Sequence, residues 1–135
     1  MSPEIQHFHH AHLFAADLDA AIEYYREYFG GEVALDMELA GARNVFMKVG
    51  RGRLHFYDQA PRDEGRGVVH HLGIQVTDLP GLVERMQAGG VEFRKPIADF
   101  VFWRYVMAPA PDGVLLELFE VDRVQFPAEM QDYFF

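Results

Sequence analysis

The sequence contains no cysteine, which excludes disulfide bonds and thiolate metal ligands. It has no apolar run long enough to span a membrane, and its first residues lack the basic-then-apolar order of a secretory signal. Basic residues are few: 12 Lys and Arg against 21 Asp and Glu give a formal net charge of −9. That balance argues against nucleic acid as a partner. These absences predict a cytoplasmic protein that acts on neither nucleic acid nor a membrane.

Histidine, in contrast, is abundant and clustered. The chain has 135 residues, a length that fits one domain, and seven of them are histidine. The histidines gather at 7–12, at 55 and at 70–71. Half of the residues are hydrophobic, which is enough for a sizeable core. Imidazoles and carboxylates are therefore the side chains that can form a metal site in this protein.

A half-chain repeat duplicates one histidine and one aspartate. His10 stands seven residues before Asp17, and the same spacing separates His71 from Asp78, so that both residues recur at an offset of 61. Each aspartate precedes a helical pattern, and the first N–H groups of that helix can donate to its carboxylate. The repeat predicts a two-fold structure with a potential metal ligand at the same point of each half.

Each half of the chain has the pattern of a strand, a helix and three further strands, which predicts an α+β fold. Residues 61–67 are polar and turn-rich and predict a connector within one domain, 1–135. Module one is expected at about 7–60, module two at about 68–121 and a C-terminal tail at 122–135, whose apolar end is expected to dock on the body or on a second subunit. The predicted strands are 7–16, 32–39, 43–49, 53–59, 68–77, 91–94, 99–108 and 114–121, and the helices run from Asp17 to Gly30 and from Asp78 to Gly89.

Strand alternation places four candidate ligands on equivalent surfaces. If the first strand of each module packs its small and aliphatic residues on the helix, His10 and His71 face the other side, while His9 and His70 point away from them. Glu117 lies between two leucines of a core-like strand, and an unpaired buried carboxylate is costly. His55 holds the equivalent position of module one, at an offset of 62. The alternation therefore groups His10, His55, His71 and Glu117.

The chain resembles the vicinal oxygen chelate superfamily, which contains glyoxalases, bleomycin resistance proteins and extradiol dioxygenases. Three features carry the resemblance: the repeated His-x6-Asp-Leu, a helix with Tyr24-Tyr25 before Gly30, and the segment from Pro111 to Leu118 that contains Glu117. The resemblance implies two tandem βαβββ modules that form curled mixed sheets around a metal-binding cleft. It also implies that His10, His55, His71 and Glu117 hold one divalent ion, such as Zn, Ni, Co, Fe or Mn.

Those ligands suit a metal-dependent enzyme that acts on a small vicinal-oxygen substrate. We expect chemistry of the glyoxalase and epimerase type, a lyase or isomerase, in which a base moves a proton next to a carbonyl. Glu117 is the expected catalytic base because it is the only carboxylate of the four. A homodimer is expected because open sheet edges tend to be covered. The candidate substrate-binding residues are His12, Tyr57, Trp103 and Tyr105.

Three alternatives stay open at the level of sequence. In extradiol dioxygenases of this family a tyrosine stands where Met107 lies here, although Tyr105 is near. A fosfomycin-type transferase needs cations for a phosphonate, and the candidates are Lys95, Arg104 and Arg123. A small-molecule binding or resistance protein of the same fold would use an apolar cleft without a metal.

Overall fold

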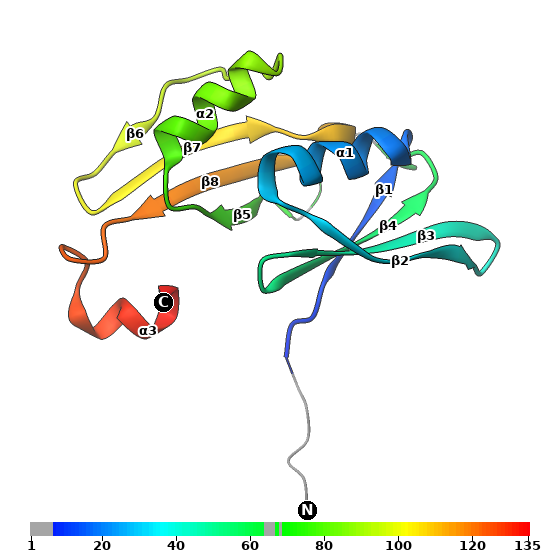
Figure 1. Ribbon diagram of the computed structural model, residues 1–135, viewed down its shortest axis with the longest axis horizontal. Helices are drawn as coiled ribbons and strands as arrows, with labels where there is room; N and C mark the ends of the chain where they lie inside the picture. The colour runs from blue at the N-terminus through cyan, green and yellow to red at the C-terminus, as the bar shows by residue number, and fades with distance from the viewer. Residues whose placement is uncertain (1–6, 64–66, 68) are drawn as a thin grey trace, which may run out of the picture. The chain divides into compact units, whose positions relative to one another are not determined.

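The same order of elements occurs twice along the chain, once in each of two compact units, Met1–Asp63 and Glu64–Phe135 (Figure 1). The computed structural model describes residues 7–63, 67 and 69–135. Each unit contains one four-stranded mixed sheet and a helix that precedes three of its strands. This confirms the α+β class predicted from the repeat. Within the described part of the chain, no helix has the length and apolarity of a membrane span.

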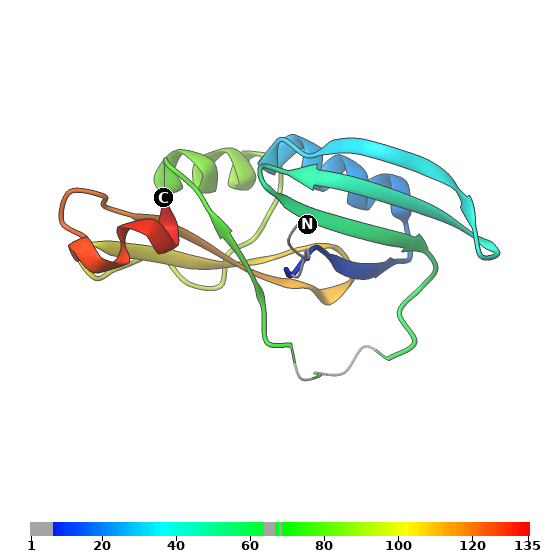
Figure 2. The ribbon, with the colours of Figure 1, turned by 90° about the horizontal axis from the view of Figure 1, so that it is seen from below.

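The sheet of the first unit has the order β1-β4-β3-β2. The outer strand β1 is parallel to β4, whereas β3 pairs antiparallel with both β4 and β2. Figure 2 shows β2 and β3 as a long hairpin. The elements are β1 (Ala11–Ala15), α1 (Leu18–Phe29), β2 (Glu32–Leu39), β3 (Ala42–Val49) and β4 (Gly52–Asp58).

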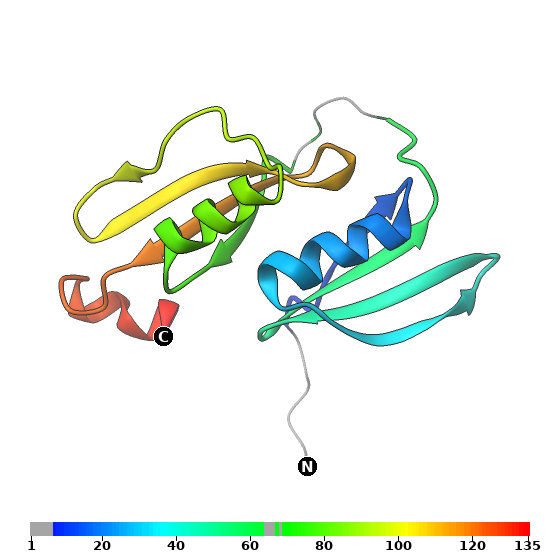
Figure 3. The same ribbon diagram turned by 45° about the horizontal axis from the view of Figure 1, so that its top comes forward.

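Helix α1 begins and ends where the sequence predicts. The Asp17 carboxylate accepts a hydrogen bond from the backbone N–H of Ala20 at 3.1 Å, and Gly30 ends the helix at a φ of 64°. The helix covers one face of the first sheet (Figure 3). Its Tyr25 ring lies 5.6 Å from the ring of Phe56 on β4, and both residues are buried. The opposite face of this sheet carries the histidines.

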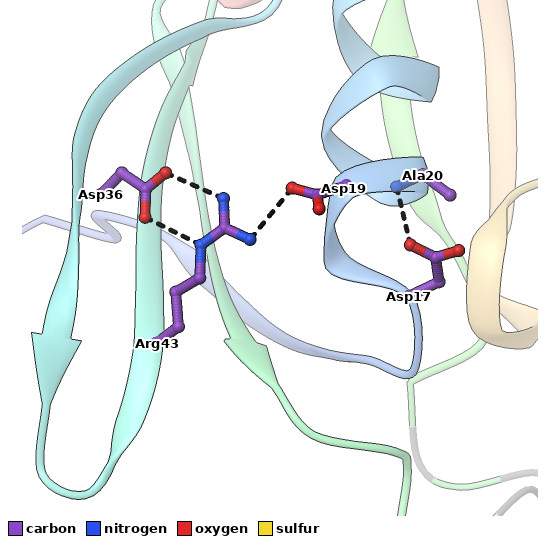
Figure 4. A network of polar contacts seen from close by, with 5 residues as sticks. All are labelled: Asp17, Asp19, Ala20, Asp36 and Arg43. Carbon is purple, nitrogen blue, oxygen red and sulfur yellow. Dashed lines mark hydrogen bonds and ion pairs between the residues drawn. The ribbon is translucent and has the colours of Figure 1, made fainter.

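An arginine joins α1 to the β2–β3 hairpin. The Arg43 guanidinium donates to both carboxylate oxygens of Asp36 on β2 and to Asp19 on α1, each at 2.9 Å (Figure 4). The bidentate contact with Asp36 uses the planar guanidinium geometry that distinguishes arginine from lysine. The side chain of Arg43 is 30% exposed and that of Asp19 is 81% exposed, so water and salt screen the contact with the helix more than the contact with Asp36. It joins the helix to the strand pair on the helix-covered face of the sheet.

The sheet of the second unit repeats the first with the order β5-β8-β7-β6. Asp78 caps α2 through the Gly81 N–H, and the Leu79 N–H donates to Glu120 on β8 at 3.0 Å. Leu79, Leu82 and Met86 of α2 are buried, as are Leu116 and Leu118 of β8. These residues form the core on the helix-covered face of the sheet. The elements are β5 (Leu72–Gln75), α2 (Leu79–Ala88), β6 (Ala98–Asp99), β7 (Trp103–Pro109) and β8 (Leu115–Val121).

Two predicted strands of the second unit differ from the structure. No strand forms at 91–94: the Val91 N–H donates back to the carbonyl of Met86 and closes the end of the helix. The predicted strand 99–108 is a tight hairpin, β6 and β7, with Val101 at a φ of 74° in its turn. Residue 68 of the predicted strand 68–77 lies outside the described residues, and β5 is shorter than predicted.

The C-terminal tail packs on the second unit. Helix α3 (Gln131–Phe134) places the ring of Phe134 at 5.4 Å from Trp103 and 5.0 Å from Phe126. Trp103 in turn stacks on Phe119 of β8 at 4.6 Å. The Gln131 side chain donates to two backbone carbonyls and holds the start of the helix. The apolar end of the chain therefore docks on its own unit.

Candidate metal centre

The uncovered face of the first sheet is lined with aromatic and imidazole rings. Cross-strand neighbours share a face, and His12 on β1, His55 on β4 and Phe46 on β3 stand directly opposite one another. Phe14 and Tyr57 form the next row along the same face. The strand alternation that predicted His55 on the face away from the helix is thus confirmed in this unit.

His55 lies at the centre of a three-ring stack. Its imidazole lies 3.8 Å from the ring of Phe46 on one side and 3.5 Å from that of His10 on the other, with interplanar angles of 16° and 13°. His10 precedes β1, so its position depends on this stacking rather than on strand pairing. The stack therefore brings two predicted ligands of the first unit into direct contact.

The surroundings of His55 favour its neutral form. Burial is the largest cause, and the neighbouring imidazoles of His10, His12 and His9 add to it; together they lower the pKa of His55 to about 4. Near neutral pH the ring is uncharged, so one ring nitrogen has a lone pair available for a metal ion. Burial likewise lowers the pKa of His12.

The second unit brings its two predicted ligands together as well. Glu117 lies on β8 directly opposite Gly73 of β5, on the face away from α2. The Nε2 atom of His71 lies 3.2 Å from the Oε2 atom of Glu117, and the two side chains are 33% and 20% exposed. The half-buried carboxylate thus has a partner, as the cost of burying a free charge requires. The structure brings the four predicted ligands together as two pairs, one in each unit.

His9 and His70 lie next to the predicted ligands, although strand alternation places them on the opposite side. The Nδ1 atoms of His9 and His10 are 2.9 Å apart, and those of His70 and His71 are 2.8 Å apart. The prediction was wrong because all four histidines precede their strands, where alternation does not hold. His9, His10 and His55 also have ligand atoms within 4.8 Å of one another, a group able to hold a metal ion.

The predicted substrate-binding residues lie beside the ligand pairs or on the same sheet faces. His12 packs on Tyr57 at 3.9 Å between ring centroids. On β7, Met107 is directly opposite Glu117, whereas Tyr105 is two pairs further along, opposite Phe119. The ring of Tyr105 stacks on Phe100 at 6.1 Å.

Two of the candidate cations are engaged elsewhere. Arg104 forms an ion pair with Glu120, which also receives the first N–H of α2, so it serves the helix-covered side of the sheet. The guanidinium of Arg123 lies 4.7 Å from the centre of the Phe135 ring. Neither cation lies beside the His71–Glu117 pair in these contacts.

Comparison with known proteins agrees with the fold. A family model described as the Glyoxalase/Bleomycin resistance protein/Dioxygenase superfamily matches residues 7–118. The chain belongs to this superfamily. A search of curated proteins found no match.

Several solved structures of this fold are similar to the chain. The fosfomycin resistance protein FosX of Listeria monocytogenes is 19% identical, with 95% of this chain and 99% of that chain covered and a TM-score of 0.73. The antibiotic binding protein TnmS3 of Streptomyces sp. CB03234 is 22% identical, with 90% and 100% covered and a TM-score of 0.72. A FosX variant complexed with Mn(II) and 1S,2S-dihydroxypropylphosphonic acid is 22% identical, with 85% and 90% covered and a TM-score of 0.69. Proteins of this fold thus include a fosfomycin resistance protein and an antibiotic binding protein.

The side chains present fit a divalent ion. Three imidazoles and one carboxylate are the donor types that Zn(II), Mn(II), Fe(II), Co(II) and Ni(II) accept. The pair in the first unit offers two imidazole nitrogens, from His10 and His55, and the pair in the second unit offers an imidazole nitrogen from His71 and a carboxylate oxygen from Glu117.

Proposed function

We propose that the protein is a metal-dependent enzyme that acts on a small substrate with adjacent oxygens, by lyase or isomerase chemistry. One observation carries the proposal: each unit brings its two predicted ligands into contact, His10 with His55 and His71 with Glu117. Contact between ligand types on the uncovered face of each sheet is what a metal centre requires of its side chains. The bound ion would polarise substrate oxygens and make a neighbouring C–H more acidic.

Glu117 is the residue to which we assign proton transfer. Its Oε2 atom is on the uncovered face of the sheet and has one close partner, the Nε2 atom of His71 at 3.2 Å. A carboxylate so placed can accept a proton from carbon and return it once it detaches from the metal. His12, Tyr57, Tyr105 and Trp103 are the proposed substrate contacts around these pairs.

Lyase or isomerase chemistry fits better than the two other enzyme alternatives. The residue directly opposite Glu117 on β7 is Met107, which has no acidic O–H, and Tyr105 lies further along the strand. This favours proton transfer over dioxygenase chemistry. The ion pair of Arg104 and the ring contact of Arg123 remove two of the three cations considered for a phosphonate.

Metal content and turnover test the proposal directly. Protein purified without a histidine tag should contain stoichiometric divalent metal or bind it on titration. The metal-loaded protein should then turn over a member of a panel containing 2-oxoaldehyde–thiol adducts, acyl-coenzyme A epimers, catechols and phosphonates. Absence of metal binding, or turnover of catechols alone, would contradict the proposal.

Glu117→Gln separates the role of the carboxylate from the fold. The substitution preserves shape but removes the base, so turnover should be abolished while the melting temperature changes little. Glu84→Gln on the exposed side of α2 is the matched control and should retain turnover. Near-normal activity of the Glu117→Gln protein would exclude Glu117 as the base.

The ring-lined face of the first sheet also supports a second candidate, a binding or resistance protein. Phe14, Phe46 and Tyr57 offer flat apolar surfaces on which an aromatic compound can stack. TnmS3, an antibiotic binding protein, shares the fold. Tight binding of such a compound that is unchanged by a chelator would favour this candidate over the enzyme.

We also propose that the protein is a cytoplasmic homodimer. The edge strands β2 and β6 each have one paired neighbour within their own sheets, which leaves an edge that another chain can cover. Light scattering on the purified protein measures the number of chains. A monomer at all concentrations would contradict the dimer and leave the metal proposal untouched.

A further inference from the structure

The two proposed imidazole ligands that begin the modules have the same unassigned neighbour. His9 precedes His10 and His70 precedes His71, and both pairs recur at the offset of 61 that defines the repeat. The ring centroids are 5.2 Å apart in the first pair and 5.1 Å in the second, with interplanar angles of 89° and 84°. The repeat therefore duplicates a pair of histidines with its edge-on geometry, rather than a single ligand.

In both pairs the same atoms meet. The Nδ1–Nδ1 distances of 2.9 and 2.8 Å are hydrogen-bond distances. A hydrogen bond between two ring nitrogens requires one protonated nitrogen and one bare nitrogen, so it couples the tautomers of the two rings. The contact also fixes the rotation of each ring about its side-chain bonds.

The second nitrogen of His71 shows which atom is left for a ligand. While Nδ1 faces His70, Nε2 faces the Oε2 atom of Glu117 at 3.2 Å. A metal-bound imidazole needs a bare nitrogen toward the ion, and its other N–H normally donates to a neighbouring acceptor. His71 has this arrangement if Nε2 is the ligand atom and the Nδ1 atom of His70 is the acceptor.

We propose that His9 and His70 are positioning residues that hold His10 and His71 in the tautomer and orientation required for metal binding through Nε2. The inference rests on the proposed metal site and adds to it the residues that orient two of its ligands. In the metal-loaded protein, Nδ1–H of His10 donates to Nδ1 of His9, and Nδ1–H of His71 donates to Nδ1 of His70. Each partner is exposed and keeps its own hydrogen on Nε2.

Metal loading should reverse the hydrogen bond in the second pair. Without metal, the Nε2 hydrogen of His71 faces Glu117, so Nδ1 of His71 is bare and His70 donates. With metal on Nε2, that hydrogen is lost and Nδ1 of His71 gains one, while His70 loses its Nδ1 hydrogen and gains one on Nε2. The two rings together carry the same number of ring hydrogens before and after loading.

Paired substitutions at positions 9 and 70 test the acceptor role. The side-chain oxygen of asparagine lies near the position of Nδ1 and can accept the same hydrogen bond, whereas phenylalanine retains a ring without an acceptor. His9→Phe and His70→Phe should each weaken Zn(II) binding by about 10–100-fold, the usual effect of losing a residue that orients a ligand. His9→Asn and His70→Asn should retain most of the affinity, and His7→Phe is the control for an exposed histidine.

Zn(II) affinity is measured by competition with a chromophoric chelator, and ring tautomers by ¹⁵N NMR with and without Zn(II). The proposal predicts the Asn-over-Phe order and the change of His71 from the Nε2–H to the Nδ1–H form on loading. An equal loss of Zn(II) affinity in the Asn and Phe variants, which direct coordination by His9 would produce, overturns the proposal. Normal Zn(II) affinity in the Phe variants also overturns it. If the unmodified protein binds no Zn(II), Mn(II) or Ni(II), the proposed metal site itself fails, and NMR of the metal-free protein still shows whether the paired rings share a hydrogen.

Discussion

Phe134→Ala should release the C-terminal helix and expose the tryptophan beneath it. Outside its own helix, the ring of Phe134 has three aromatic neighbours, with ring-centroid distances of 5.4 Å to Trp103, 6.1 Å to Phe119 and 5.0 Å to Phe126. Helix α3 is only one turn long, so it depends on this packing rather than on its own hydrogen bonds.

The expected loss of stability in Phe134→Ala follows from the burial of the ring. Truncation of a fully buried phenylalanine costs about 3–5 kcal/mol, and each well-oriented aromatic pair contributes about 0.5–1.5 kcal/mol. Phe134 is half-buried, so we expect a loss of roughly 2 kcal/mol, about half of the full value. A loss of that size undocks the tail in a large fraction of molecules even where the sheet stays folded.

Trp103 reports the change because it is the only tryptophan of the chain. In the Phe134→Ala protein its emission should shift to longer wavelength and become more accessible to acrylamide. Tyr133→Ala is the matched control: Tyr133 is the preceding residue of the same helix and is 78% exposed, so its removal should leave the emission unchanged. Unchanged emission in Phe134→Ala, or equal shifts in both variants, would refute the docking of α3 on Trp103.

Three further predictions concern the first unit. Arg43→Ala should lower the melting temperature more than Arg43→Lys, because lysine keeps a charge near Asp36 without the bidentate contact. In 1 M salt, thermal melts should show a smaller difference in melting temperature between the two variants. The free energy of unfolding should fall as the pH drops from about 6.5 to about 4, because the unfolded chain protonates His55 before the folded chain does. In urea titrations at several pH values, His55→Asn should reduce the slope of the free energy of unfolding against pH. An unchanged slope would contradict the low pKa of His55. Phe56→Ala, at a position 1% exposed beneath α1, should cost about 3–5 kcal/mol in urea unfolding, and a cost below 1 kcal/mol would contradict its place in the core.

Local signals made much of the fold predictable. The caps at Asp17 and Asp78 and the glycine stop at Gly30 act within a few residues, and the structure has each of them. The last strand of each module was also located closely, since β8 runs from Leu115 to Val121 against a predicted 114–121. These features depend on chain-local hydrogen bonds and alternation, which the sequence carries directly.

Features that depend on pairing partners were harder to predict. The segment 91–94 has strand-like residues but no neighbouring strand to bond with, and β6 is only a two-residue edge. The contacts of His9 and His70 were missed because alternation was extended beyond the ends of β1 and β5. The available signal was the His-His doublet, which recurs with the repeat.

The sequence by itself determined the two-fold repeat, the helix boundaries and the set of candidate ligands, because each depends on the type and spacing of nearby residues. Only the tertiary structure decided which rings meet: the stacking of His10 on His55, the contact of His71 with Glu117, and the docking of Phe134 on Trp103. The physical reason is that these contacts join residues far apart in the chain. Their geometry follows from strand register and side-chain packing, which the spacing of residues along the chain does not specify.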